Sequence, residues 1–169
     1  MQSILNRASV KVSLVVTRVR SGPWGGAIFS GRSATGDAIK CIANFDKILR
    51  PPAPGELWEI AGEMKRHPNY GDQLHVDRAT FLPPKGRLIV GYLAHSPKFV
   101  GIGRAKAERL WSVFGEQLGE LLDCGDAEKL MELGNLTETD AKSLVSTWKT
   151  AARETEVVAF CDEVGRWLA

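Results

Sequence analysis

The sequence is poor in the residues that disulfide, metal and cofactor chemistry require. It has only 3 cysteines and 3 histidines among 169 residues, and no Cys-x-x-Cys pair. Cys41, Cys124 and Cys161 lie far apart, which predicts buried core thiols in a reducing compartment. The histidines show no ligand spacing with one another or with the cysteines. We therefore expect neither a bound metal nor another cofactor.

Long apolar runs are also missing. No segment approaches the roughly 18 consecutive apolar residues that a membrane-spanning helix needs. The apolar stretch from Val10 to Val16 is interrupted by Lys11 and Ser13 and lacks the small-residue cleavage site of a signal peptide. These absences predict a cytoplasmic protein with no membrane partner.

Motifs for nucleotide binding and catalysis are absent as well. The spacing of Gly31 and Gly36 suits a phosphate-binding loop, but Asp37 follows where that loop needs Lys and then Ser or Thr. No Ser/His/Asp or Cys/His order indicates a nucleophile. The sequence thus predicts a binding protein rather than an enzyme.

Charge is plentiful but unevenly placed along the chain. Residues 1–109 carry 17 Lys/Arg and 8 Asp/Glu, a net charge of +9, whereas residues 110–169 carry 5 and 12, a net charge of −7. Such a chain attracts a polyanion at one part and repels it at another. Clustering of surface charge without function stays open as the alternative.

Two different periodicities predict two domains. In residues 8–83, apolar residues alternate from Val10 to Val16, and five short strands separated by turns predict a small closed OB-like β-barrel. Beyond the Pro83–Gly86 segment the period changes to about 3.6, which predicts an all-α domain over residues 86–168. Thr137 is expected to cap a helix that reaches Trp148, with a separate last helix over 151–168. The predicted class is α+β, a barrel followed by tandem helix-hairpin-helix elements.

The turn Gly101-Ile102-Gly103 is the strongest functional signal. A helix follows it and opens with Arg104 and Lys106. Backbone N–H groups at a helix start, the helix dipole and nearby cations all favour a phosphate. Together with Lys98, these residues are the predicted DNA-binding site. A plain helix–helix turn is the alternative, whereas a dinucleotide site would need a preceding strand and a third glycine.

Two weaker elements accompany this turn. Around Gly134 the same arrangement recurs, but Glu138 and Asp140 open its helix and disfavour a phosphate, so we expect it to be mainly structural, with Gly134 and Lys142 as possible DNA contacts. At the turn between the last two strands, cations lie beside an aromatic ring that could stack on a base. Its possible DNA contacts are Lys65, Arg66, His67 and Tyr70, and an ordinary turn with a packed tyrosine is equally open.

Several segments in order point to a family. They are Pro54-Gly55-Glu56-Leu57-Trp58, His67-Pro68-Asn69-Tyr70-Gly71, Gly101-Ile102-Gly103, the degenerate hairpin at Gly134, Trp148, and Val157 to Gly165. Across residues 10–167 this order resembles the N-terminal region of RecD-like ATP-dependent DNA helicases, the exodeoxyribonuclease V alpha-like proteins. The resemblance implies an OB-like barrel, then helix-hairpin-helix elements, with residues 101–104 facing DNA.

The same resemblance implies further partners and limits. In that family two ATP-driven motor domains follow, so this chain is expected to be a fragment, with ATP and Mg²⁺ needed only by an absent motor. The implied partners are single-stranded, duplex or forked DNA and the motor domains themselves. Two alternatives remain: a RuvA-like junction-binding scaffold, and a docking module that holds a protein such as a single-strand-binding protein.

Overall fold

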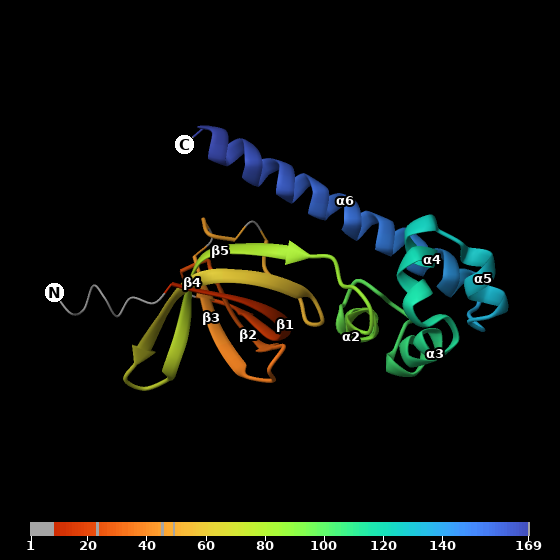
Figure 1. Cartoon of the computed structure of the whole chain (residues 1–169), viewed down its shortest axis with the longest axis horizontal. Coiled ribbons are helices and arrows are strands. Elements are labelled where there is room, and N and C mark those ends of the chain that lie inside the picture. Colours follow the sequence, from red (N-terminus) through yellow and green to blue (C-terminus); the bar gives the residue numbers. More distant parts are fainter. Residues whose placement is uncertain (1–8, 23, 45, 49, 169) are drawn as a thin grey trace. The chain divides into compact units, whose positions relative to one another are not determined.

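The chain folds into two compact units that divide between Leu82 and Pro83 (Figure 1). The computed structural model describes residues 9–168 except residues 23, 45 and 49, with side chains as far as Glu154. Within these described residues, no helix combines the length and the apolar character needed to cross a membrane.

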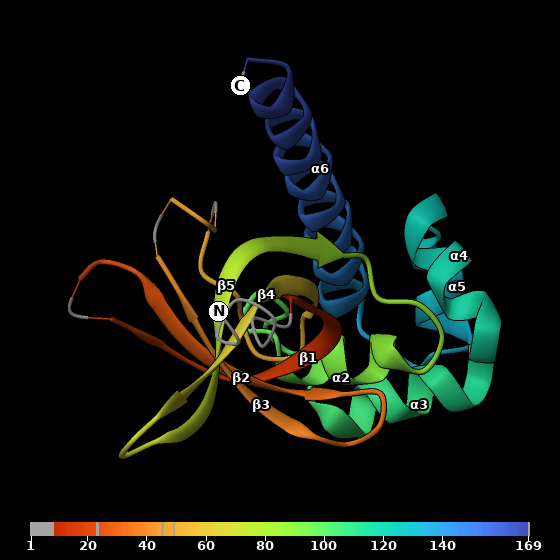
Figure 2. The same cartoon turned by 60° about the vertical axis from the view of Figure 1, so that its left-hand side comes forward.

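The first unit is a closed β-barrel of five strands. The strands are β1 (Ser9–Ser21), β2 (Ala27–Ser33), β3 (Ala38–Ala43), β4 (Leu57–His67) and β5 (Gly71–Leu82). Their order around the barrel is β1-β2-β3-β5-β4, closing back on β1 (Figure 2). All neighbours are antiparallel except β3 and β5, which run parallel. The predicted α+β class with a small barrel is confirmed.

Alternate side chains of β1 fill the barrel, and a bulge in β1 changes which of its side chains face outward. Leu14 and Val16 of β1 are buried, as the period of two predicts. The register between β1 and β2 then shifts between Val16 and Arg18. A bulge adds one residue and reverses which positions face outward. After the bulge, Arg18 and Arg20 are exposed, although strict alternation would place them on the same face as the buried Leu14 and Val16.

A buried carboxylate fastens the segment that leads into β4. Glu56 is 0% exposed and accepts hydrogen bonds from Arg50 at 3.0 and 2.6 Å, from the backbone N–H of Ala53 at 2.6 Å and from Trp58 Nε1 at 3.3 Å. The Arg50 guanidinium also lies 5.2 Å from the Trp58 ring centroid. Each carboxylate oxygen is satisfied, which is the condition under which a buried charge is tolerated.

The second unit is helical. Its elements are α2 (Leu88–His95), α3 (Arg104–Phe114), the 3-10 turn η1 (Gly115–Gln117), α4 (Leu118–Cys124), α5 (Ala127–Glu132) and α6 (Glu138–Leu168). Aromatic side chains form part of its core: the Tyr92 ring lies 5.0 Å from that of Phe99 and 5.9 Å from that of Trp148. Leucines from α3, α4, α5 and α6 complete this core: Leu110, Leu118, Leu122, Leu130 and Leu144.

Two details differ from the sequence predictions. The expected separate last helix is wrong, because α6 runs unbroken for 31 residues; no glycine or proline interrupts the chain between Glu138 and Val164. Cys41 is buried, and burial raises the pKa of its thiol to about 12. Cys124, however, is exposed, because Leu118 and Leu122 hold the inward face of α4. Cys161 lies outside the residues whose side chains are described.

Glu56→Ala should destabilise the barrel strongly. The substitution leaves the Ala53 and Trp58 donors without their acceptor and Arg50 without its counter-charge. Removing one partner of a buried ion pair is costly, and we expect a loss of about 2–4 kcal/mol in the free energy of unfolding, since Arg50 keeps some contact with water. Urea denaturation followed by tryptophan fluorescence measures it.

Glu59→Ala, three residues further along the chain in β4, is the matched control. Glu59 pairs with Lys11 at 3.4 Å on the surface, and exposed pairs contribute about 0–1 kcal/mol. Equal losses in the two variants would contradict the role given to Glu56.

Candidate nucleic-acid interface

The Gly101-Ile102-Gly103 turn joins α2 to α3 and is held by its central residue. Ile102 is 4% exposed and anchors the turn in the helical core. Gly101 has φ +87°, a conformation that side chains disfavour. Gly103 is the N-cap of α3 and has extended backbone geometry. The alternation of glycine and isoleucine therefore places backbone at the surface while one apolar side chain fixes it from inside.

The start of α3 is open to an anion. Gly103 provides no side-chain cap, and the first backbone bond into the helix runs from the Ala107 N–H to the Gly103 carbonyl at 3.0 Å. The N–H groups of the residues between them precede the helical ladder. A Cβ at Gly103 would meet nothing within 4 Å, and Arg104 is exposed. This is the arrangement at which helix N-termini bind phosphate.

Lys106 is bound by other groups of the protein itself. Its Nζ donates to the Gly101 carbonyl at 2.9 Å and to Asp140 Oδ2 at 2.8 Å. Asp140 belongs to the first turn of α6, and its other oxygen would lie 2.9 Å from a Cβ at Gly101. The hydrogen bond from Lys106 holds the pKa of the Asp140 carboxyl below its usual range. Lys106 and Asp140 thus fasten the turn, and their charges offset each other.

The other two predicted cations differ from each other. Lys98 Nζ lies 2.9 Å from Glu154 Oε2, and the Lys98 side chain is 31% exposed. An ion pair at the surface is worth about 0–1 kcal/mol, so a phosphate can displace it. Among the described residues Arg104 has no carboxylate partner. Of the three cations, Arg104 is therefore the one whose charge is directly available at the turn.

The second hairpin is built for packing. Gly134 is buried, and a Cβ there would lie 2.5 Å from the Leu130 carbonyl and 2.6 Å from Leu110 Cδ2. Its N–H donates to the Lys129 carbonyl at 3.4 Å. The predicted cap at Thr137 is confirmed, since its Oγ1 accepts the Asp140 N–H at 3.1 Å. The glycine permits close approach of the turn after α5 to α3 rather than exposing its amide.

Lys142 is paired along α6. Its Nζ lies 2.6 Å from Glu138 Oε1, four residues earlier on the same helix. That hydrogen bond lowers the pKa of the Glu138 carboxyl. Glu138 and Asp140 together leave the start of α6 acidic, which disfavours a phosphate there.

The turn between β4 and β5 exposes an aromatic ring. Tyr70 is 65% exposed, and its ring lies 4.7 Å from that of His67. Lys40 of β3 places Nζ 5.0 Å from the Tyr70 centroid. Lys65 and Arg66 are exposed at the end of β4, and Arg66 lies 3.9 Å from Asp72. The structure therefore brings these predicted residues to an open surface, with Lys40 added.

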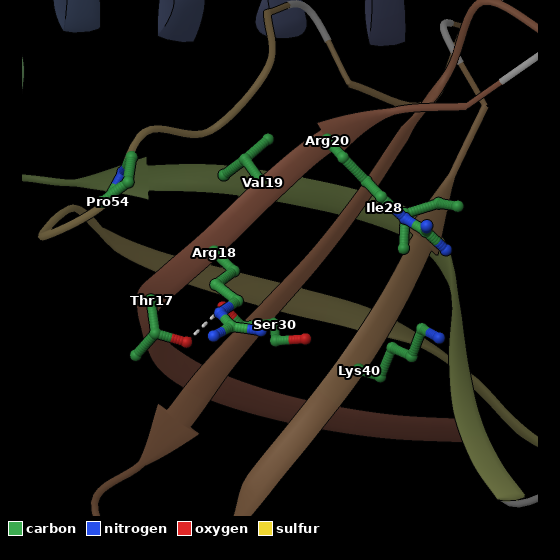
Figure 3. Close-up of a pocket in the computed structure, with 8 residues that line it drawn as sticks. All are labelled: Thr17, Arg18, Val19, Arg20, Ile28, Ser30, Lys40 and Pro54. Carbon is green, nitrogen blue, oxygen red and sulfur yellow. Dashed lines mark hydrogen bonds between the residues drawn. The ribbon is translucent and has the colours of Figure 1, made fainter. Parts of the chain in front are cut away.

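A basic hollow on the barrel is not predicted by the sequence patterns. Its volume is about 580 Å³, and its lining is Thr17, Arg18, Val19, Arg20, Ile28, Ser30, Lys40 and Pro54 (Figure 3). The only local signal is the Arg-Val-Arg run at the end of β1. Lys40 joins these arginines through strand register, which no local pattern reveals.

Two comparisons with known proteins find no match. No protein-family model matches the chain, and no curated protein matches it.

Gly134→Ala should destabilise the helical unit. The added methyl group meets a backbone carbonyl and a core leucine, and overpacking of this kind costs about 1–3 kcal/mol. Urea denaturation monitored by helical circular dichroism measures the loss. Gly91→Ala in α2 is the control, because a Cβ there meets nothing within 4 Å; alanine in a helix is favoured over glycine by roughly 0.5–1 kcal/mol. A Gly134→Ala protein as stable as Gly91→Ala would show that close packing is not the reason for Gly134.

Proposed function

We propose that this chain binds DNA without sequence preference, as the non-catalytic N-terminal region of a RecD-like DNA helicase, with an OB-like barrel and a tandem helix-hairpin-helix domain. The observation that carries the proposal is the uncapped start of α3 at Gly103, with Arg104 exposed beside it. The ordered sequence segments that resemble RecD-like helicases support the proposed parentage.

The chemistry of the turn favours the DNA backbone over the bases. Amide donors, the helix dipole and one arginine recognise a phosphate oxygen and carry no information about sequence. Such contacts position a protein on DNA and depend on release of counterions. Binding through this turn is therefore expected to be weak in isolation and steeply dependent on salt.

The two hairpins have unequal roles in this proposal. The hairpin between α2 and α3 meets DNA through residues 101–104. The hairpin between α5 and α6 supplies Asp140, which holds Lys106 and, through it, the Gly101 carbonyl. The second hairpin thus supports the first instead of repeating its contact.

Arg104→Glu should weaken binding to duplex DNA about tenfold or more and lower its salt dependence. Removing one phosphate-neutralising cation reduces the slope of log K against log salt by about 0.9 on duplex DNA. Fluorescence anisotropy with labelled single-stranded, duplex and forked DNA measures both quantities. Arg109→Glu is the matched control: Arg109 is exposed on the same helix, five residues after Arg104.

Two outcomes would contradict this assignment. One is that Arg104→Glu and Arg109→Glu both bind DNA as tightly as the unmodified chain. The other is a strong preference for four-way junctions with tetramer formation, which would favour the RuvA-like scaffold.

Asp140→Asn should strengthen DNA binding. The substitution removes a negative charge near the turn and leaves the ammonium of Lys106 uncompensated, which adds about one cation to the site. We expect affinity to rise severalfold and the salt slope to become steeper. Glu138→Gln on the same helical turn is the control, since its partner is Lys142 and not Lys106. A fall in affinity with circular dichroism unchanged would mean that the carboxylate is needed at the site.

A further inference from the structure

We propose that the basic hollow on the outer face of the barrel is a second binding site, which takes single-stranded nucleic acid. Phosphates would lie on Arg18, Arg20 and Lys40, and a base would stack on Tyr70. The site lies wholly in the barrel unit and is separate from the α3 turn, so it goes beyond the function proposed above.

Strand register assembles the cations. Arg18 of β1 is paired with Ser30 of β2, which is paired with Lys40 of β3, so the three form one row across the sheet. Arg20 lies in the next outward row, opposite Ile28. In Figure 3 the Arg18 side chain runs toward Ser30 and the Arg20 side chain toward Ile28. The bulge after Val16 is what places both arginines on this face.

The cations of the hollow lack acidic neighbours. Three of its eight lining residues are Lys or Arg, and no Asp or Glu is among them. Within the described part of the chain, Arg18, Arg20 and Lys40 have no carboxylate partner. Grouped cations in a concave surface repel one another and concentrate a positive field. This contrasts with Lys98, Lys106 and Lys142 of the helical unit, each of which has an acidic partner.

An aromatic ring borders the same surface. Lys40 lines the hollow and also places its Nζ 5.0 Å from the Tyr70 centroid. Tyr70 stays 65% exposed even with Lys40 and His67 against it, so ring surface remains for a base. Base–aromatic stacking is worth about 1–3 kcal/mol and tolerates any base.

These features select a single strand. A phosphate alone would need the cations but not the exposed tyrosine. A duplex presents phosphates but keeps its bases stacked inside, beyond reach of Tyr70, whereas the bases of a single strand are accessible. The volume of about 580 Å³ falls within the roughly 300–1,000 Å³ typical of ligand sites. A positively charged groove beside a stacking platform is the general form of such sites.

The test compares variants of the full chain by fluorescence anisotropy on labelled oligo(dT), oligo(U) and a mixed-sequence duplex. Arg18→Ala/Lys40→Ala should bind the single strands about tenfold or more weakly, and its salt slope should fall by roughly 0.7 for each phosphate that is no longer neutralised. Tyr70→Ala should bind the single strands roughly tenfold more weakly, and Tyr70→Phe should restore the affinity. Arg32→Ala is the control, because Arg32 is exposed on β2 outside the hollow. Binding to either oligonucleotide supports the site, and the tighter one identifies DNA or RNA as its ligand.

Arg104→Glu separates this site from the α3 turn. Loss of duplex binding in Arg104→Glu, with oligonucleotide binding retained, supports two independent sites. If Arg104→Glu changes nothing while Arg18→Ala/Lys40→Ala abolishes binding, the function proposed for the turn fails and the barrel site stands. The barrel site is overturned if folded Arg18→Ala/Lys40→Ala and Tyr70→Ala proteins bind both oligonucleotides as the unmodified chain does.

Discussion

The barrel depends on the buried carboxylate of Glu56. Beyond its side-chain bonds, its backbone carbonyl accepts the Val16 N–H at 2.9 Å, and the neighbouring Gly55 N–H donates to the Val16 carbonyl at 2.8 Å. These bonds fall where β1 leaves its pairing with β4, whose last pair is Val15 with Leu57. The bulge follows at once and turns Arg18 and Arg20 outward. The side chain and the backbone of Glu56 therefore hold the segment that enters β4 against β1, at the point where the bulge begins.

Charged residues are arranged differently at the α3 turn and in the barrel hollow. In the helical unit the lysines near the Gly101–Gly103 turn are drawn into ion pairs, and Lys106 donates to the Gly101 carbonyl and to Asp140. What remains for a ligand is a set of fixed amides and Arg104. In the barrel hollow the cations have no acidic partner among the described residues, so a bound anion would supply the charge that balances them. To an anion, the turn would offer preorganised dipoles and the hollow would offer net positive charge.

Local sequence patterns predicted much of the structure, but they did not predict contacts between residues far apart in the sequence. Alternation along Val10 to Val16 indicated a strand, and Thr137 was identified as a cap because a cap involves only neighbouring residues. The Gly101-Ile102-Gly103 turn was found for the same reason. The partnership of Lys106 with Asp140 joins residues 34 positions apart, and the row of Arg18, Ser30 and Lys40 depends on a bulge and on two strand pairings. Neither could be deduced from spacing along the chain.

If both proposed sites bind, their presence in one chain has a consequence that neither site has alone. Phosphate contacts through one arginine and a few amides give modest affinity that salt removes. When one nucleic acid engages both sites, the second contact forms at the high effective concentration set by the connection between the units, and the affinities combine. The gain exists only for a ligand that offers a backbone to the turn and accessible bases to Tyr70. Single-stranded DNA, alone or joined to a duplex, would meet that requirement and a duplex alone would not, so joining the two proposed sites would discriminate between DNA structures without any contact that reads sequence.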